Sequence, residues 1–350
     1  KINIDQMRVI YNSMVNHTTY VKGPPGTGKT ETIFNVVLSA YANDKSVLIC
    51  SNNNHPVNDI YEKMTKSLTR KNPKTLINEH IIFPIIRLGN TNELTNTFLY
   101  LKELLAYAQK KAKSALDEDK TNEEKEKVMN GYSELRQLLI NYEQRIELLD
   151  KIESLKKISS LSTIQRIQSQ INNQIELENK KLESLPFIED STVAEYVISA
   201  NDDWKFQNYM YYSSLAHIRK LISPTYKDIK EIINIENVED GVKQLKNYLR
   251  DDKNLKRFLD VFPVVVTTNI SAAQLGSSKQ HFDLCIMDES GQCNVATSLI
   301  PIIRAKDLLL VGDTNQLQPV TVLENEVNPL YHRYSEGQSI RTYRIFAKRR

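Results

Sequence analysis

Short apolar runs bounded by turn residues occur towards both ends of the chain and are missing from its middle. The runs "TTYV" (18–21), "SVLIC" (46–50) and "IIFPIIRLG" (81–89) have the continuous apolar character of strands that are buried on both faces. A helical pattern at 31–43 separates the first two runs. Apolar runs of the same kind occur again at 264–268, 283–289 and 307–313. The pattern predicts a parallel sheet built from both ends of the chain.

The middle of the chain has a helical pattern. Between Gly89 and Gly241 there is one glycine, Gly131, and only two prolines, Pro186 and Pro224. One apolar stripe at three- and four-residue spacing comprises Leu135, Leu138, Leu139, Tyr142, Ile146 and Leu149. A second long helix is expected over 159–185, ending before Pro186, and the two helices would pair as an antiparallel stalk. Shorter helices are expected at 204–222, 226–234, 239–250 and 252–260.

These textures predict an α/β fold interrupted by a long helical insertion. We expect residues 1–92 and 262–350 to form one split α/β domain with a parallel sheet flanked by helices. Residues 93–261 would form the insertion, with an antiparallel coiled-coil stalk and accessory helices. An insertion at a loop tip disturbs such a core little, so the two halves can still meet in space.

Composition narrows the class of protein. The 350 residues carry 46 Lys+Arg against 43 Asp+Glu, so any contact with nucleic acid must come from local patches rather than from a global basic field. Cys50, Cys285 and Cys293 show no metal-site spacing and are expected to be reduced core thiols of an intracellular protein, cytoplasmic or, in a eukaryote, nuclear. No apolar run has the roughly 20 residues that cross a bilayer, and we expect no membrane association. Because the first residue is not Met, we expect a portion of a longer protein.

The stretch "GPPGTGKT" has the pattern of a phosphate-binding loop between a strand and a helix. Its glycines permit the tight turn that directs backbone N–H groups at phosphate oxygens. Lys29 would reach the β- and γ-phosphates, and the Thr30 hydroxyl would bind Mg²⁺. The expected nucleotide contacts are Gly23, Pro24, Pro25, Gly26, Thr27, Gly28, Lys29 and Thr30.

Two further strands end in polar residues that suit the same site. Asp288 and Glu289 follow the run "FDLCIM", where Asp288 would hold Mg²⁺ and Glu289 would deprotonate the attacking water. The run "LLLV" is followed by Gly312, Asp313 and Gln316, and an amide at this place can sense the γ-phosphate. The sequence therefore predicts a nucleoside triphosphatase whose two main motifs lie about 250 residues apart.

Taken in order, these segments resemble the first RecA-like motor domain of the Upf-like (1B) group of superfamily 1 helicases, which are P-loop NTPases of the AAA type. "INIDQMRVI" is similar to the adenine-reading Q motif, so the resemblance assigns Gln6 to the nucleotide. "DESGQ" stands where the family has Asp-Glu-Ala-x-Gln, which makes Gln292 a coupling residue near the γ-phosphate and Ser290 a departure. "VGDTNQLQPV" is close to the family's motif III.

The resemblance also implies contacts with single-stranded DNA or RNA. "CSNNNHPVNDI" resembles motif Ia and "VVVTTNISAAQL" resembles motif Ic, each at the end of an expected strand. The residues that match these motifs are Ser51, Asn52, Asn53, Thr267, Thr268 and Asn269. "NNNHPV" departs further from the family pattern than the other motifs do.

The function that the resemblance implies is ATP-driven translocation on a single strand and unwinding of duplexes, with ATP and Mg²⁺ as cofactors. The resemblance covers residues 1–60 and 262–320, and nothing similar to motifs IV, V or VI follows in the sequence. In this family a second motor domain supplies the arginine fingers, which contribute roughly 10³–10⁵ in rate. This chain alone is therefore expected to hydrolyse ATP weakly.

Two other functions stay open at this point. An SMC- or ABC-type ATPase also places a coiled coil between the two nucleotide motifs, but no Leu-Ser-Gly-Gly signature precedes "FDLCIMDES". A non-catalytic, nucleotide-dependent binding module is the other alternative.

Tyr209, Tyr211 and Tyr212 could stack bases, although core packing is the more common role of such residues.

Overall fold

The computed structural model describes residues 3–24, 26–72, 76–112, 140–142, 144–162, 164–187 and 204–313. The elements before the stalk are α1 (Ile4–Val15), β1 (Thr18–Lys22), α2 (Lys29–Ala42), β2 (Val47–Ser51), α3 (Asn54–Lys66), β3 (Thr69–Lys71), β4 (Asn78–His80), β5 (Ile85–Arg87) and α4 (Thr91–Ala112). The stalk contains helical residues 144–161 and α6 (Gln165–Ser184). The later elements are α8 (Trp204–Arg219), η1 (Lys220–Ile222), η2 (Pro224–Tyr226), α9 (Lys227–Ile233), α10 (Val238–Arg250), α11 (Asp252–Val261), β6 (Val264–Thr268), η3 (Ser271–Gln274), β7 (Phe282–Met287), η4 (Ser290–Gln292), α12 (Val295–Ile302) and β8 (Ala305–Gly312).

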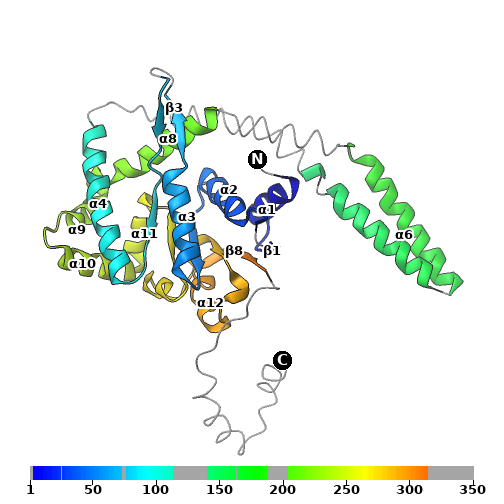
Figure 1. Cartoon of the computed structure of the whole chain (residues 1–350). Helices are drawn as coiled ribbons and strands as arrows, with labels where there is room; N and C mark the ends of the chain where they lie inside the picture. The colour runs from blue at the N-terminus through cyan, green and yellow to red at the C-terminus, as the bar shows by residue number, and fades with distance from the viewer. Residues whose placement is uncertain are drawn as a thin grey trace, which may run out of the picture.

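A six-stranded sheet in the order β1-β8-β7-β2-β6-β5 forms the centre of the described structure (Figure 1). Each neighbouring pair in this sheet is parallel. Three of the strands, β1, β2 and β5, come from before residue 92, and the other three, β6, β7 and β8, come from after residue 262, so both parts of the chain build one sheet. The expectation of an α/β fold with a parallel sheet is confirmed. The strand that precedes the phosphate loop, β1, is separated from β7 by β8.

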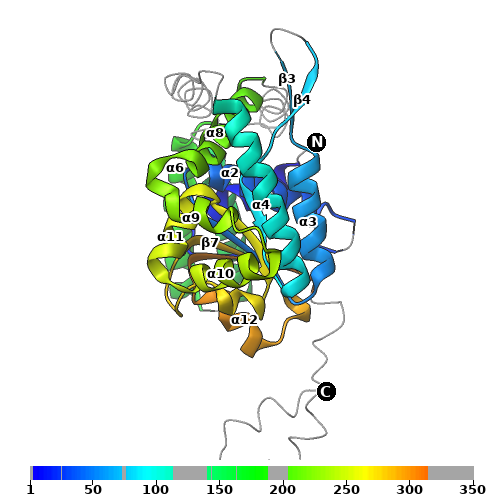
Figure 2. The ribbon, with the colours of Figure 1, turned by 90° about the vertical axis from the view of Figure 1, so that its left-hand side faces the viewer.

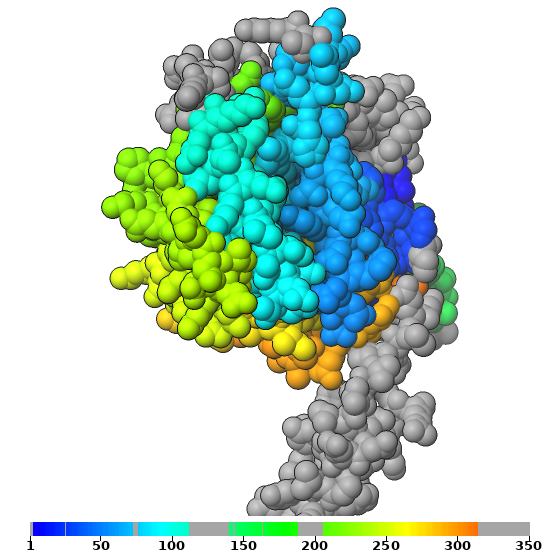
Figure 3. Space-filling model, turned by 60° about the vertical axis from the view of Figure 1, so that its left-hand side comes forward, coloured from blue at the N-terminus to red at the C-terminus, as the bar shows by residue number. Residues whose placement is uncertain are grey.

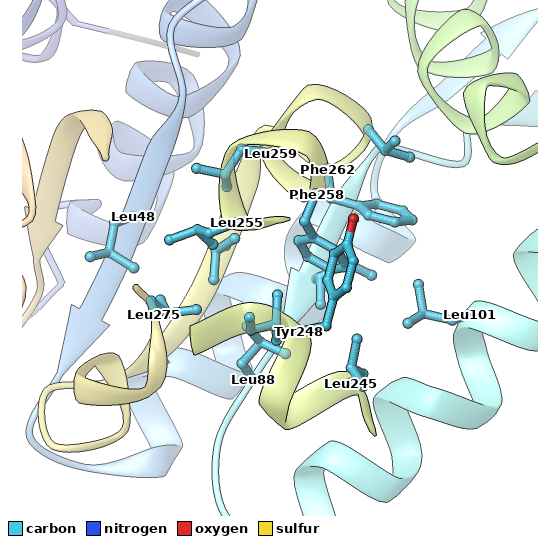
Figure 4. Close-up of a cluster of buried hydrophobic side chains, with 14 of the residues drawn as sticks. Leu48, Leu88, Leu101, Leu245, Tyr248, Leu255, Phe258, Leu259, Phe262 and Leu275 are labelled. Carbon is cyan, nitrogen blue, oxygen red and sulfur yellow. The ribbon is translucent and has the colours of Figure 1, made fainter. Parts of the chain in front are cut away.

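Alternate residues of the central strands pack into two apolar clusters on opposite faces of the sheet. On β2, Val47 and Ile49 join a cluster that includes buried residues of α2 and α3. Leu48 and Cys50 join the other cluster, together with residues of α4, α10 and α11 (Figure 4). Figure 2 shows α4 and α10 in front of the sheet, and Figure 3 shows the same segments, cyan and yellow-green, at the surface of the molecule. Because both faces are covered, every residue of β2 is buried, which explains its continuous apolar sequence.

The helices between β5 and β6 contribute to the same core as the sheet. Phe98 of α4, Leu245 of α10 and Phe258 of α11 belong to one buried cluster with Leu48 and Val265 of the sheet. Gly241 permits this packing, since a Cβ there would lie 2.1 Å from the Phe98 ring. The domain boundaries at residues 92 and 262 stay predictions. The short helices α8 to α11 and η1 lie where the sequence predicts them.

The stalk is an antiparallel pair in which residues 144–161 lie against α6. Arg145 donates to the carbonyl oxygens of Leu182 and Leu185 at 3.3 and 3.4 Å. Further along, the Glu178 carboxylate is 1% exposed and accepts from Lys151 at 2.7 Å. Gln174 and Lys181 also donate to Glu178, at 2.8 and 3.2 Å. A buried charge with this set of partners fixes the register of the two helices.

The predicted stripe of the first stalk helix is wrong at one position. Leu149 is 46% exposed, and Ile152, 4% exposed, is buried instead. The stripe placed Leu149 three residues after Ile146, whereas the buried residues of this helix include Tyr142 and Ile152, and Arg145 bonds to the end of α6. Arg145 is polar but contacts the end of α6, so a search for regularly spaced apolar residues does not find it. Leu135, Leu138 and Leu139 lie outside the described residues.

A small antiparallel hairpin, β3–β4, was not predicted. Arg70 of β3 is buried; its guanidinium lies 3.3 Å from the centroid of the Tyr211 ring and pairs with Glu79 at 2.9 Å. It also donates to the Asn208 side chain at 3.3 Å, so it joins the hairpin to α8. Tyr209 and Tyr211 are buried in this region, which confirms core packing for them rather than base stacking.

The expectation that the cysteines are core thiols is confirmed. Cys50, Cys285 and Cys293 are free, buried thiols. Among the helices of the described ranges, none has the length and apolar character needed to cross a membrane.

Candidate active site

The phosphate loop joins the end of β1 to the start of α2. Gly26 and Gly28 adopt left-handed backbone conformations, with φ of 81° and 83°. The loop is closed by Thr27, whose hydroxyl donates to the carbonyl oxygen of Pro24 at 2.8 Å. Gly28 is the residue before α2, so the first N–H groups of that helix open onto the loop. These are the features that let a backbone surround an anion.

Lys29 and Glu289 meet across the site. Lys29 Nζ donates to Glu289 Oε1 at 2.8 Å, although the residues are 260 positions apart in sequence. Both side chains are largely shielded, with exposures of 12% and 22%. Glu289 Oε2 in turn accepts from Gln292 Nε2 at 3.3 Å. The structure therefore brings together three of the residues that the sequence assigns to nucleotide hydrolysis.

Asp288 lies directly after β7 and is buried. Burial raises the pKa of its carboxyl to about 6, and the negative charge of Glu289 contributes in the same direction. The Glu289 N–H, which donates to Asp288 Oδ1 at 2.8 Å, and the Lys29 charge oppose this rise. A buried carboxylate with this little compensation is suited to binding a cation.

The backbone at Glu289 is in an unusual conformation. Its φ is 51°, in the left-handed region that non-glycine residues seldom adopt. This conformation turns the chain sharply from β7 into η4 and so directs the Glu289 side chain back to Lys29. Strain of this kind, of about 1–3 kcal/mol, is found where a side chain must be held in a particular place.

Gln6 contacts the phosphate loop directly. Its Nε2 donates to the Thr27 carbonyl oxygen at 3.3 Å, and its Oε1 accepts from the Asn3 N–H at 3.1 Å in a capping box that starts α1. A Cβ on Gly28 would lie 2.6 Å from Gln6 Nε2, so the glycine is needed for this approach. The structure thus places Gln6 beside the site that the resemblance assigns to it.

The end of β8 completes the site. The Gly23 N–H donates to the Gly312 carbonyl oxygen at 3.0 Å, which ties the start of the phosphate loop to β8. A Cβ on Gly312 would lie 2.7 Å from Ser290 Oγ, and one on Gly291 would lie 3.0 Å from the Asp313 carbonyl oxygen. Close packing of this turn on β8 explains the glycines on both sides, and it gives Ser290 a contact that the sequence did not indicate.

The remaining nucleotide-site predictions are placed as follows. Thr30 lies half-buried in the first turn of α2, next to Lys29. Asp313 is buried directly after β8. Pro25 and Gln316 lie outside the described residues.

The six nucleic-acid candidates lie at the adjacent ends of β2 and β6, where Ser51 pairs with Thr268. Ser51, Thr267 and Asn269 are buried, and their side-chain polar atoms have no hydrogen-bond partner in the described part of the chain. Asn52 and Asn53 are exposed, and Thr268 is half-buried. As the side chains stand, only this second group is accessible to a strand of nucleic acid.

Cys293 is a neighbour of this region that sequence reasoning treated only as a core thiol. Its Sγ donates to the Glu289 carbonyl oxygen at 3.6 Å. Burial raises its pKa, while the nearby Asn269 side chain, the Asn52 backbone and Ser298 lower it. Cys293 thus lies between the nucleotide site and the nucleic-acid candidates. In the sequence, only its position four residues after Glu289 could have indicated this.

Comparison with known proteins agrees with this geometry. The family profile AAA_11, described as an AAA domain, matches residues 1–324. An archaeal protein from Methanocaldococcus jannaschii, named Uncharacterized ATP-dependent helicase MJ0104, is 22% identical over 327 residues, which is 93% of this chain and 38% of that protein.

Two eukaryotic proteins are similar over shorter stretches. The DNA-binding protein SMUBP-2 of Mesocricetus auratus is 31% identical over 117 residues, or 31% of this chain and 12% of its own. The DNA replication ATP-dependent helicase/nuclease JHS1 of Arabidopsis thaliana is 35% identical over 68 residues, 19% of this chain and 5% of its own. This chain thus spans well under half the length of the relatives it matches.

The profile match extends over most of the chain, and the six-stranded parallel sheet carries the phosphate loop and the acidic pair in the arrangement that the motifs require. The chain therefore belongs to the AAA_11 family of AAA domains, as a motor domain of the Upf-like, superfamily 1B helicase type.

Proposed function

We propose that this chain is the ATP-hydrolysing first motor domain of a helicase that translocates on single-stranded nucleic acid and unwinds duplexes. The observation that carries the proposal is the contact of Lys29 Nζ with Glu289 Oε1 at 2.8 Å. A phosphate-loop lysine and an acidic pair at the end of a strand act on the same ligand when a phosphate chain binds between them. Their contact here therefore supports a site for a nucleoside triphosphate.

The residues fit ATP with Mg²⁺. The left-handed glycines and the first N–H groups of α2 would surround the β- and γ-phosphates, with Lys29 as their counter-charge. Asp288 and the Thr30 hydroxyl would hold Mg²⁺, which neutralises charge on the phosphates when it is bound. The raised pKa of Asp288 supports this role, because a nearby cation would relieve the cost of the buried carboxylate.

Glu289 is assigned to the attacking water. To accept a proton from that water its carboxylate must leave Lys29, so entry of the phosphates would free Glu289 and occupy Lys29 at the same time. Gln292 contacts Glu289, and with Gly312, Asp313 and Gln316 it is assigned to sensing the γ-phosphate. The ion pair of Lys29 with Glu289 and the binding of a triphosphate by Lys29 are then alternatives.

Single-stranded DNA or RNA is the proposed track. Asn52, Asn53 and Thr268 offer accessible polar groups for a nucleic-acid backbone, at the same end of the sheet as the acidic pair. Ser51, Thr267 and Asn269 would have to turn outward to take part. The names of the relatives, two of them ATP-dependent helicases and one a DNA-binding protein, favour this proposal.

A second motor domain is the proposed partner within a longer protein. Because the relatives are much longer than this chain, their remaining length has room for such a domain. Its arginine fingers would stabilise the charge that develops on the transferring phosphoryl group, and the present chain alone would hydrolyse ATP weakly.

The test is ATP hydrolysis by the parent protein with and without single-stranded oligonucleotides of DNA and of RNA. We expect stimulation by one of them, loss of activity in Lys29→Ala, and retention in Lys66→Ala, which removes an exposed lysine that pairs with Glu62 within α3. Hydrolysis that neither oligonucleotide stimulates would exclude the helicase proposal. Activity that survives in Lys29→Ala would exclude the site itself.

A further inference from the structure

The stalk carries aliphatic side chains that its two helices leave exposed. A pair of helices buries one stripe from each partner, and apolar residues beyond that stripe remain in contact with water. The exposed aliphatic residues near the stalk tip, between 41% and 82% accessible, are Ile158, Leu161, Ile164 and Ile167. A group of this kind, rather than a single exposed leucine, is typical of an interaction surface.

Helical periodicity puts Ile158 and Ile167, one on each helix, on the same flank of the stalk as an open groove nearer its base. The groove, of about 390 Å³, is lined by side chains that include Glu147, Leu148, Lys151, Glu178 and Lys181. Ile158 follows Lys151 by seven residues and Glu147 by eleven, spacings that return to the same side of a helix. On α6, Ile167 precedes Glu178 by eleven residues, a spacing that also returns to the same side of a helix. This flank therefore has exposed apolar side chains near the tip and a groove nearer the base. Figure 1 shows the two-helix stalk that carries them, with α6 as one of its helices.

The two ends of the stalk have opposite charge. Residues 154–175 contain Lys156, Lys157 and Arg166 and no acidic residue. The basal parts, 144–153 and 176–184, hold four basic and six acidic residues. The tip is thus positive and the base negative.

We propose that two copies of this chain associate through their stalks, antiparallel, with the tip of each seated in the basal groove of the other. A two-fold axis makes the contact occur twice, so both tips and both grooves are covered at once. The positive tip then lies against the negative base, with Arg166 near the partner's Glu147. The result is a four-helix bundle, the usual way in which two-helix units bury a second apolar face. A tip-to-tip arrangement would instead bring like charges together.

Sedimentation equilibrium of the whole chain tests this proposal. We expect the average mass to rise with concentration toward twice the mass of one chain. Leu161→Glu and Ile167→Glu should weaken association by about tenfold or more, because symmetry buries each new charge twice. Leu149→Glu is the matched control: Leu149 is 46% exposed, against 41% for Ile167, but it lies on the opposite flank, two residues from both Glu147 and Lys151. It should leave association unchanged.

A charge exchange identifies the pairing. Arg166→Glu and Glu147→Arg should each weaken association, and the double variant should restore it, because each copy then offers the reversed pair to the other. Circular dichroism confirms that the variants keep their helices. A chain that remains monomeric at all concentrations overturns the proposal. Equal effects of Leu149→Glu and Ile167→Glu, or a double variant as weak as the single ones, overturn it as well.

Discussion

Replacing Asp288 with asparagine should stabilise the nucleotide-free protein. Burial raises the pKa of Asp288 from 3.8 to about 6. The carboxylate is still ionised at pH 7, but its ionisation costs more free energy in the folded protein than in the unfolded chain. The folded state binds more protons than the unfolded state between these values, and the stability of the native protein therefore falls as pH rises through this window. Asparagine keeps an oxygen that can accept the Glu289 N–H and removes the charge.

The size of the effect follows from the two pKa values. Since a tenfold change in protonation corresponds to about 1.4 kcal/mol, the Asp288→Asn protein should be more stable by about 1.5 kcal/mol at pH 5 and about 3 kcal/mol at pH 7. Urea unfolding of both proteins at a series of pH values, without Mg²⁺ and nucleotide, measures this difference. Hydrolysis of ATP should be lost in the same variant.

Asp283→Asn, near the start of β7, is the control with the opposite sign. Burial opposes its ionisation, but bonds from Lys306 and from Ser46 lower the pKa of Asp283 overall. Its contribution to stability is present above the unfolded pKa and is lost as pH falls, so asparagine should destabilise the protein at pH 7. If Asp288→Asn were less stable than the native protein at pH 7, or if the difference did not grow between pH 5 and pH 7, the account of Asp288 would be refuted.

Four further substitutions test other contacts. Glu289→Gln removes the charge that holds Lys29 and should tighten binding of a fluorescent ATP analogue while reducing hydrolysis at least about 100-fold; weaker binding would contradict a competing ion pair. Gly28→Ala and Gly26→Ala both strain a left-handed residue by about 1–2 kcal/mol, but only the first also meets a neighbouring side chain, so thermal unfolding should show the larger loss for Gly28→Ala. Arg70→Ala should cost about 2–4 kcal/mol and speed hydrogen exchange in β3 and β4, since it removes a buried ion pair and a ring contact; unchanged exchange would show that the hairpin is held by other means.

The strands of the central sheet were predictable because they are buried on both faces. Val47 to Cys50 and Val264 to Val266 are apolar at every position, a pattern that needs no knowledge of neighbours. The hairpin was not predictable for the converse reason. Thr69–Lys71 and Asn78–His80 are short and polar, and what holds them is the distant contact of Arg70 with α8.

The nucleotide site was predictable in its members and not in their contacts. Glycine spacing indicates the loop, and an acidic pair after an apolar run indicates the strand end. The ion pair of Lys29 with Glu289 depends on the sharp backbone turn at Glu289, which no residue type there demands. Burial of Thr267 and Asn269 could not be inferred either, because their polar side chains favour exposure unless the packing around β6 is known.

The strand order has a consequence for how the protein is made. Among the described strands β1 pairs with β8 alone, through contacts such as Thr18 with Leu308 that span about 290 residues. During synthesis, the phosphate loop therefore leaves the ribosome long before β8, the strand that pairs with β1 at the start of that loop. ATP cannot assist folding of the early segment, because the binding surface is completed only after β8 has been synthesised. Chains interrupted before β8 would leave the β1 edge unpaired and become substrates for chaperones or proteases.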